Sequence, residues 1–266
     1  ARTRAAGLHR WYVLGFASEE DLDKAAERLA GVAEISKVQF RTRLYRASDC
    51  KTYPFQATAN GQTRALVTAD FNDPNLFWQW HYINNADQAV ATTSVAGADI
   101  NVADAWKLTA GNPEVIVAIV DEGVKYTHPD LAANMWINPN PSPEYKNQDI
   151  HGWNFAADGP ISWGQKGDSG HGTHVAGTVA AVNNNGIGVC GVAGGTGKGD
   201  GVRLMSCQIF SGDLTGDALV SSRAVKYAAD HGASILQCSW GIKAGIYTSD
   251  NMFIKQSPMD YEALQY

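Results

Sequence analysis

The sequence predicts an α/β domain with an open, mainly parallel sheet, preceded by a small α+β unit. Residues 115–120 form an unbroken apolar run, which is typical of a strand buried on both faces of a sheet. Helical and strand patterns alternate from about residue 76 onwards. Residues 9–46 instead show a single strand–helix–strand pattern, followed by a polar connection that contains Pro and Gly. We therefore predict two units, residues 1–75 and residues 76–266.

The amino-terminal unit is predicted from one helix between two strands. Residues 9–16 are apolar and aromatic, which indicates a strand. Ser18 is the predicted cap of a helix whose apolar residues 22, 25, 26 and 29 follow the helical spacing, and Gly31 ends it. Residues 35–45 alternate imperfectly and predict the second strand.

The second unit alternates helices with strands, so right-handed crossovers should build a parallel sheet. In such sheets, residues at the carboxyl ends of strands collect at the ligand site. Asp121 directly follows the apolar run, and Ser239 ends a later strand. The predicted helices are 102–108, 174–182, 217–231 and one starting at 258, and the predicted strands are 115–120, 202–209 and 233–239.

Composition excludes several classes of protein. With 44% hydrophobic and 18% charged residues, a chain of 266 residues should form a globular core. The net charge of -6 and the lack of a basic cluster argue against a nucleic-acid partner. No run approaches the roughly 18 apolar residues of a membrane span. Four separated cysteines, at 50, 190, 207 and 238, predict buried free thiols, with a disulfide between Cys207 and Cys238 as the alternative.

Two motifs carry the predicted chemistry. Asp121-Glu122-Gly123 ends the buried strand. The segment 170–177, Gly-His-Gly-Thr-His-Val-Ala-Gly, opens a helix, and its His171 follows Asp121 by 50 residues. A histidine that acts as a general base must be held in one tautomer beside a buried carboxylate. Strand ends and helix starts hold side chains more precisely than loops do. The pair therefore indicates a carboxylate–imidazole site.

Further motifs match in order and spacing: His-Pro-Asp-Leu at 128–131, the Asn-rich segment 183–189 and Ser-Trp-Gly at 239–241. With them, the sequence resembles the subtilisin-like serine protease (subtilase) family over residues 115–241. The resemblance implies a three-layer α/β fold with a parallel sheet flanked by helices, incomplete in this chain. It implies that Asp121 is the orienting carboxylate and His171 the general base. His174 would pack the helix.

The sequence departs from the family at three points. Glu122 stands where the family usually has a small hydroxyl residue, which could change the tuning of Asp121. The Gly-Thr-Ser stretch with the nucleophile and the Ala-Ala-Gly-Asn type segment with the oxyanion asparagine do not occur in the 266 residues. Ser169 lies in a Gly-Asp-Ser-Gly match to the unrelated chymotrypsin family, which we interpret as chance.

These departures leave two hypotheses. The first is a serine endopeptidase divided at Tyr266, in which a second polypeptide supplies the serine and the asparagine. The second is a truncated or non-catalytic peptide-binding homologue. The resemblance also makes residues 1–75 similar to the family's propeptide, hence a zymogen or a fixed accessory domain, and implies an extracellular, periplasmic or cell-surface location.

The family binds an extended peptide as an added strand between two edges. By resemblance, Ser239, Trp240 and Gly241 are one edge, and Leu214, Thr215 and Gly216 the other. Trp240 would line the pocket for the residue before the cleaved bond and favour apolar side chains; the alternative is a core tryptophan. No cofactor is needed for the chemistry. A structural calcium ion is expected where Asp130 meets Asn184 in the 183–189 loop.

Overall fold

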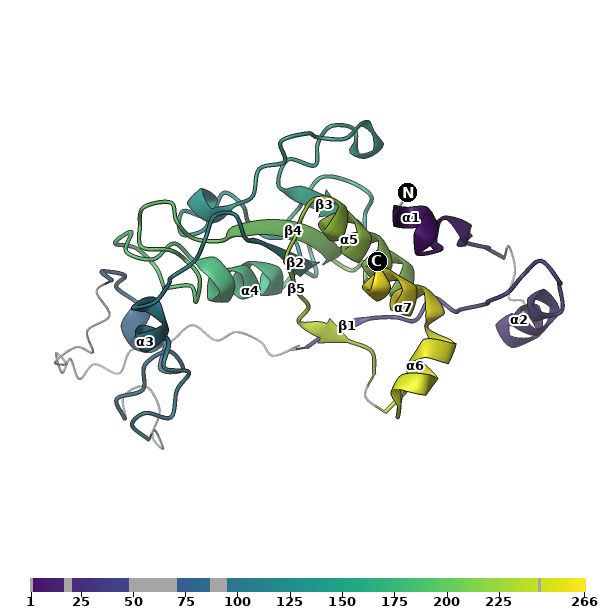
Figure 1. Ribbon diagram of the computed structural model, residues 1–266, viewed down its shortest axis with the longest axis horizontal. Coiled ribbons are helices and arrows are strands. Elements are labelled where there is room, and N and C mark those ends of the chain that lie inside the picture. Colours follow the sequence, from purple (N-terminus) through teal and green to yellow (C-terminus); the bar gives the residue numbers. More distant parts are fainter. Residues whose placement is uncertain (1, 17–20, 48–70, 87–94, 244) are drawn as a thin grey trace.

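The computed structural model describes residues 2–16, 21–47, 71–86, 95–243 and 245–266 (Figure 1). Its centre is a four-stranded sheet in the order β3-β4-β2-β5, and all its pairings are parallel. The register sets Val120 opposite Cys207 and shifts between Asp121 and Glu122. The strands are β2 Ile116–Glu122, β3 Gly152–Asn154, β4 Arg203–Phe210 and β5 Ile235–Gln237.

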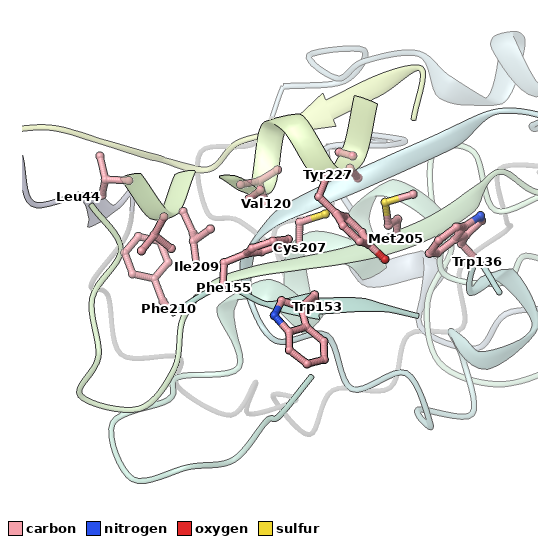
Figure 2. Packing of buried hydrophobic residues seen from close by; sticks show 14 residues of the cluster. Leu44, Val120, Trp136, Trp153, Phe155, Met205, Cys207, Ile209, Phe210 and Tyr227 are labelled. Carbon is pink, nitrogen blue, oxygen red and sulfur yellow. The ribbon is translucent and has the colours of Figure 1, made fainter. Parts of the chain in front are cut away.

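One helix covers each face of this sheet. On one face, Val117 and Ile119 of β2 pack against Ala176 and Ala180 of α4 (His171–Ala180). On the other face, alternate residues of β2 and β4 pack against α5 (Ala218–Asp230). Figure 2 shows this second cluster, in which Tyr227 of α5 lies among side chains of the sheet that include Val120 and Cys207. Each fully buried apolar side chain contributes roughly 1.5–3 kcal/mol, so these two clusters hold the layers together.

Shorter elements complete the described part of the chain. α7 packs beside α5 and follows α6 (Figure 1). Near α3, Tyr82, Val102 and Cys190 form a third buried cluster. None of the described helices is long and apolar enough for a membrane span. The remaining elements are α1 Arg2–Ala5, α2 Leu22–Ala30, α3 Val102–Trp106, α6 Asp250–Gln256, α7 Pro258–Gln265, β1 Tyr45–Arg46, β6 Trp240–Gly241, and the 3-10 helices Leu8–Arg10, Leu76–Trp78, Ala132–Asn134 and Pro143–Tyr145.

The predicted three-layer α/β fold is confirmed. Every helix and strand predicted for residues 76–266 is present, with ends that differ by a few residues. α4 begins at His171 and not at residue 174, because Gly170 turns the chain with a φ of 78°. The prediction did not include β3 and α6, which are short and lack a clear apolar period.

The amino-terminal unit differs from its prediction. Residues 11–16 join no described strand, and Tyr12 is 83% exposed. The second predicted strand is reduced to β1 and an isolated bridge at Arg43. The helix is present, capped by the Asp21 side chain, while Ser18 lies outside the described residues. Apolar side chains of this unit surround an open groove of about 840 Å³, so no closed core forms within its described part. The boundary at residue 75 stays a prediction.

Candidate active site

The structure brings Asp121 and His171 together at the carboxyl end of β2. His171 is the first residue of α4, and its Nδ1 lies 2.7 Å from Oδ1 of Asp121. The Asp121 side chain is fully buried, and that of His171 is 15% exposed. A charge-assisted hydrogen bond of this length fixes both the tautomer and the orientation of the ring. Nδ1 carries the proton toward the carboxylate, so Nε2 is the basic nitrogen.

Burial controls the protonation of Asp121. Desolvation raises the pKa of its carboxyl group to about 6, against the opposing effects of the His171 hydrogen bond and the Arg46 charge. Oδ1 also accepts a hydrogen bond from the Glu122 N–H at 2.6 Å. Above about pH 6 the carboxylate is ionised, as an orienting group must be.

Glu122, the residue that departs from the family pattern, is buried and fully engaged in polar contacts. Its carboxylate is 2% exposed and pairs with the Arg46 guanidinium. It accepts hydrogen bonds from the Ser169 N–H and O–H at 3.2 and 3.1 Å and from the His171 N–H at 2.9 Å. Glu122 therefore anchors the start of α4. Ser169 is a partner of this carboxylate, which agrees with its interpretation as a chance motif match.

The substrate edges predicted by resemblance lie on either side of residues 42–47. β1 pairs antiparallel with β6, with Tyr45 opposite Gly241 and Arg46 opposite Trp240. The Ala47 N–H donates to the Ser239 carbonyl at 2.8 Å.

On the other side, the Leu44 N–H donates to the Gly216 carbonyl at 2.9 Å. The main-chain hydrogen bond to the added strand comes from Gly216, and Leu214 and Thr215 do not take part in it. Leu214 pairs with Ser211 in its own turn and is 51% exposed, and Thr215 is exposed. A segment of the amino-terminal unit thus lies as an added strand between two edges.

Trp240 packs against the sheet and also lines a pocket, while its role beside the cleaved bond stays a prediction. Its indole N–H donates to the Val120 carbonyl at 2.7 Å, which fixes the ring against the sheet. The same ring lines an apolar pocket of about 220 Å³, together with Leu44, which is 4% exposed. Leu44, which lies three residues before Ala47 in the added strand, forms part of the wall of this pocket, hereafter the Leu44 pocket.

The two predicted calcium ligands, Asp130 and Asn184, have different hydrogen-bond partners. Asp130 accepts hydrogen bonds from the Asn185 amide at 2.7 Å and the Val189 N–H at 2.9 Å. Asn184 points its amide elsewhere, to the Thr196 carbonyl at 3.3 Å. Each carboxylate oxygen of Asp130 thus accepts one N–H hydrogen bond, and calcium binding stays a prediction. Within the described residues, no three acidic, histidine or cysteine side chains gather as a metal site.

The structure also shows where His174 and the cysteines lie. His174 is exposed, so it does not pack the helix against the core; it lies near His81, whose pKa is lowered by burial and by His174. Cys190 and Cys207 are buried free thiols, as predicted, Cys238 is free but exposed, and Cys50 lies outside the described residues. No local pattern pointed to Arg46, because its contact with Glu122 depends on how the two units meet.

Known proteins resemble the chain over the region that builds this site. The model of the Peptidase_S8 subtilase family matches residues 112–263. Neuroendocrine convertase 2 of Bos taurus is 36% identical over 148 residues, 56% of this chain and 21% of that protein. PC3-like endoprotease variant B of Hydra vulgaris is 33% identical over 235 residues, 88% of this chain and 29% of that protein.

Among solved structures, the Aeromonas sobria serine protease, in complex with its chaperone, matches with a TM-score of 0.53 and 24% identity, over 73% of this chain and 29% of that one. This likeness shows the shared fold. The chain spans 21–29% of the length of these relatives. Because the family model covers more than half of the 266 residues and includes the site, the chain belongs to the subtilase family.

Proposed function

We propose that the protein is a serine endopeptidase in which this chain supplies Asp121 and His171 and a second polypeptide supplies the serine and the oxyanion asparagine. The observation that carries the proposal is the 2.7 Å contact between His171 Nδ1 and the buried Asp121 carboxylate. It leaves Nε2 available to accept the proton of a serine hydroxyl. Family membership supports the same reaction class.

In this mechanism, Nε2 of His171 takes the hydroxyl proton as the serine oxygen attacks the peptide carbonyl. The ionised Asp121 stabilises the imidazolium that results. The imidazolium then gives its proton to the departing amine, and the acyl group stays on the serine. Water repeats the sequence: His171 accepts its proton, hydroxide attacks the ester, and the serine oxygen leaves and recovers the proton.

The added strand supports a zymogen. Residues 44–47 make main-chain hydrogen bonds to Gly216 and Ser239, which are the bonds that an extended peptide substrate would need. A substrate therefore competes with this strand. The Leu44 pocket beside Trp240 favours an apolar side chain in the corresponding residue of the substrate.

A non-catalytic peptide-binding function is the alternative, and one observation favours it. The added strand is held by main-chain hydrogen bonds and by the Leu44 pocket, neither of which needs a serine. A chain of this kind would bind extended peptides between the same edges and release them uncut.

Two measurements separate the alternatives. Mass spectrometry of the native preparation should find a second polypeptide with a Gly-Thr-Ser stretch, and a fluorophosphonate probe should label that polypeptide. The control is the His171→Ala chain with the same companion, which should show at least about 100-fold less labelling. Only one species of 28.6 kDa, or no labelling with both polypeptides present, would support the binding protein.

The family resemblance extends to location. We propose that the protein acts outside the cytoplasm, because the relatives it matches include the halolysin of Haloferax mediterranei and human furin. Fractionation of the native cells tests this: recovery of the protein with soluble cytoplasmic markers would contradict it. Calcium stays a prediction of the resemblance.

A further inference from the structure

Consecutive residues of β2 hold the same histidine at two points. Asp121 binds the ring of His171 through Nδ1 at 2.7 Å. Glu122 binds the backbone of His171, accepting its N–H at 2.9 Å. Both carboxylates are buried, with 0% and 2% of their side chains exposed. The ring contact orients the imidazole, and the backbone contact fixes the point from which the ring extends.

The start of α4 depends on this second contact. The first N–H groups of a helix have no acceptor within the helix, and a side chain at the cap position usually supplies one. Here the cap residue is Gly170, which makes no side-chain cap. Glu122 supplies the acceptor from the neighbouring strand, for both Ser169 and His171. Its negative charge also favours the positive end of the helix dipole.

Two further contacts make Glu122 specific for this role. A Cβ atom at Gly172 would lie 2.1 Å from the Glu122 carbonyl oxygen, so the first turn of α4 packs directly on the backbone of β2. The Arg46 guanidinium pairs with the buried Glu122 charge and compensates for its desolvation.

We propose that Glu122 is the positioning residue for His171, holding the amino-terminal turn of α4 on β2 so that the imidazole meets Asp121. The inference deepens the proposed function, since it concerns the same dyad of Asp121 and His171. Its decisive test needs neither a serine nor a substrate, so failure of the protease proposal would leave it measurable.

The test compares Glu122→Gln with Asp168→Asn by NMR at pH 8. Asp168 is the matched control, because it lies just before α4 and accepts from the Gly212 and Gln165 N–H groups but not from His171. Glu122→Gln should abolish the low-field resonance of the His171 Nδ1 proton and speed exchange of its amide about 10- to 100-fold. Asp168→Asn should leave both unchanged.

Retention of the resonance in Glu122→Gln, or its equal loss in Asp168→Asn, would overturn the proposal. If Glu122→Gln does not fold, the wild-type chain decides: the His171 amide should be protected although it has no acceptor within α4, and fast exchange would refute the bond to Glu122. With the companion polypeptide, Glu122→Gln should lower kcat up to about 100-fold with KM nearly unchanged.

Discussion

The α/β layers and the amino-terminal unit start from similar apolar runs and end in different structures. Val120 in β2 is fully buried, whereas Tyr12 in the predicted strand 9–16 is 83% exposed. β2 has β4 and β5 as neighbours, while residues 11–16 pair with no described strand. Strand propensity expresses packing against neighbours, so the same pattern forms a strand only where a sheet supplies partners.

The difference in burial between the two regions is tested most directly by removing one apolar side chain from each. Ile119→Ala should lower the free energy of unfolding by about 2–5 kcal/mol, since Ile119 is fully buried against α4. Leu14→Ala should change it by less than about 0.5 kcal/mol, because Leu14 is 59% exposed. Urea unfolding measures both. Equal effects would mean that residues 11–16 take part in a core.

A second prediction concerns the strand that joins the two regions. Leu44→Asp should weaken docking of residues 42–47 by roughly 2–4 kcal/mol, because it places a charge in the apolar pocket beside Trp240. Hydrogen exchange of β1 should rise while β2 stays protected. Tyr45→Asp is the matched control, since Tyr45 is 45% exposed. Equal exchange in the two variants would exclude the Leu44 pocket as the anchor.

A third prediction sharpens the description of the site. The pKa of Asp121 in the folded chain, about 6, lies above the ordinary value of 3.8, so folding favours the protonated form. This stabilisation is complete below pH 3.8 and is lost as the pH rises through about 6. Asp121→Asn should therefore be more stable than the wild type at pH 8, by up to about 3 kcal/mol.

Urea unfolding at pH 4 and pH 8 measures this difference. The difference in the free energy of unfolding between Asp121→Asn and the wild type should be small at pH 4 and large at pH 8. The exposed Glu114→Gln should show no such change. A gap that is the same at both values would show that burial does not control the ionisation of Asp121.

The smallest effect is expected where the amino-terminal unit meets α7 at the surface. The Lys37 ammonium pairs with the Glu262 carboxylate, with 46% and 17% of the two side chains exposed. A double-mutant cycle with Lys37→Ala and Glu262→Ala should give a coupling energy below about 1 kcal/mol. A larger value would mean that charge, and not the Leu44 strand, holds the unit in place.

The sequence predicted the part of the fold in which local patterns agree with the sheet. The β2 run is apolar on both faces, and β2 and β4 lie at the centre of the sheet. The predicted helix 217–231 agrees with α5, Ala218–Asp230, to within a residue at each end. β3 has three residues and was not predicted, because a strand that short has no measurable period. The strand predicted for residues 9–16 was wrong, since an apolar pattern does not show whether a partner strand exists.

The site divides in the same way. Asp121 and His171 were predicted from motifs at a strand end and a helix start, which are local signals. The roles of Glu122 and Arg46 could not be predicted from the sequence, because they depend on contacts between segments far apart along the chain. The metal prediction rested on the resemblance and on residue type, and it stays a prediction; the Asn184 amide donates to Thr196, whereas Asp130 accepts from Asn185.

The contact of Gly172 with the Glu122 carbonyl has a consequence for how such a domain can diverge. Two peptide units touch there without side chains between them, so their separation is set by atomic radii. Exchange of leucine, isoleucine or valine elsewhere in the layers changes cavity volumes and melting temperature but has no side chain to alter at this point. The core can change over evolutionary time while Asp121 and His171 keep their alignment.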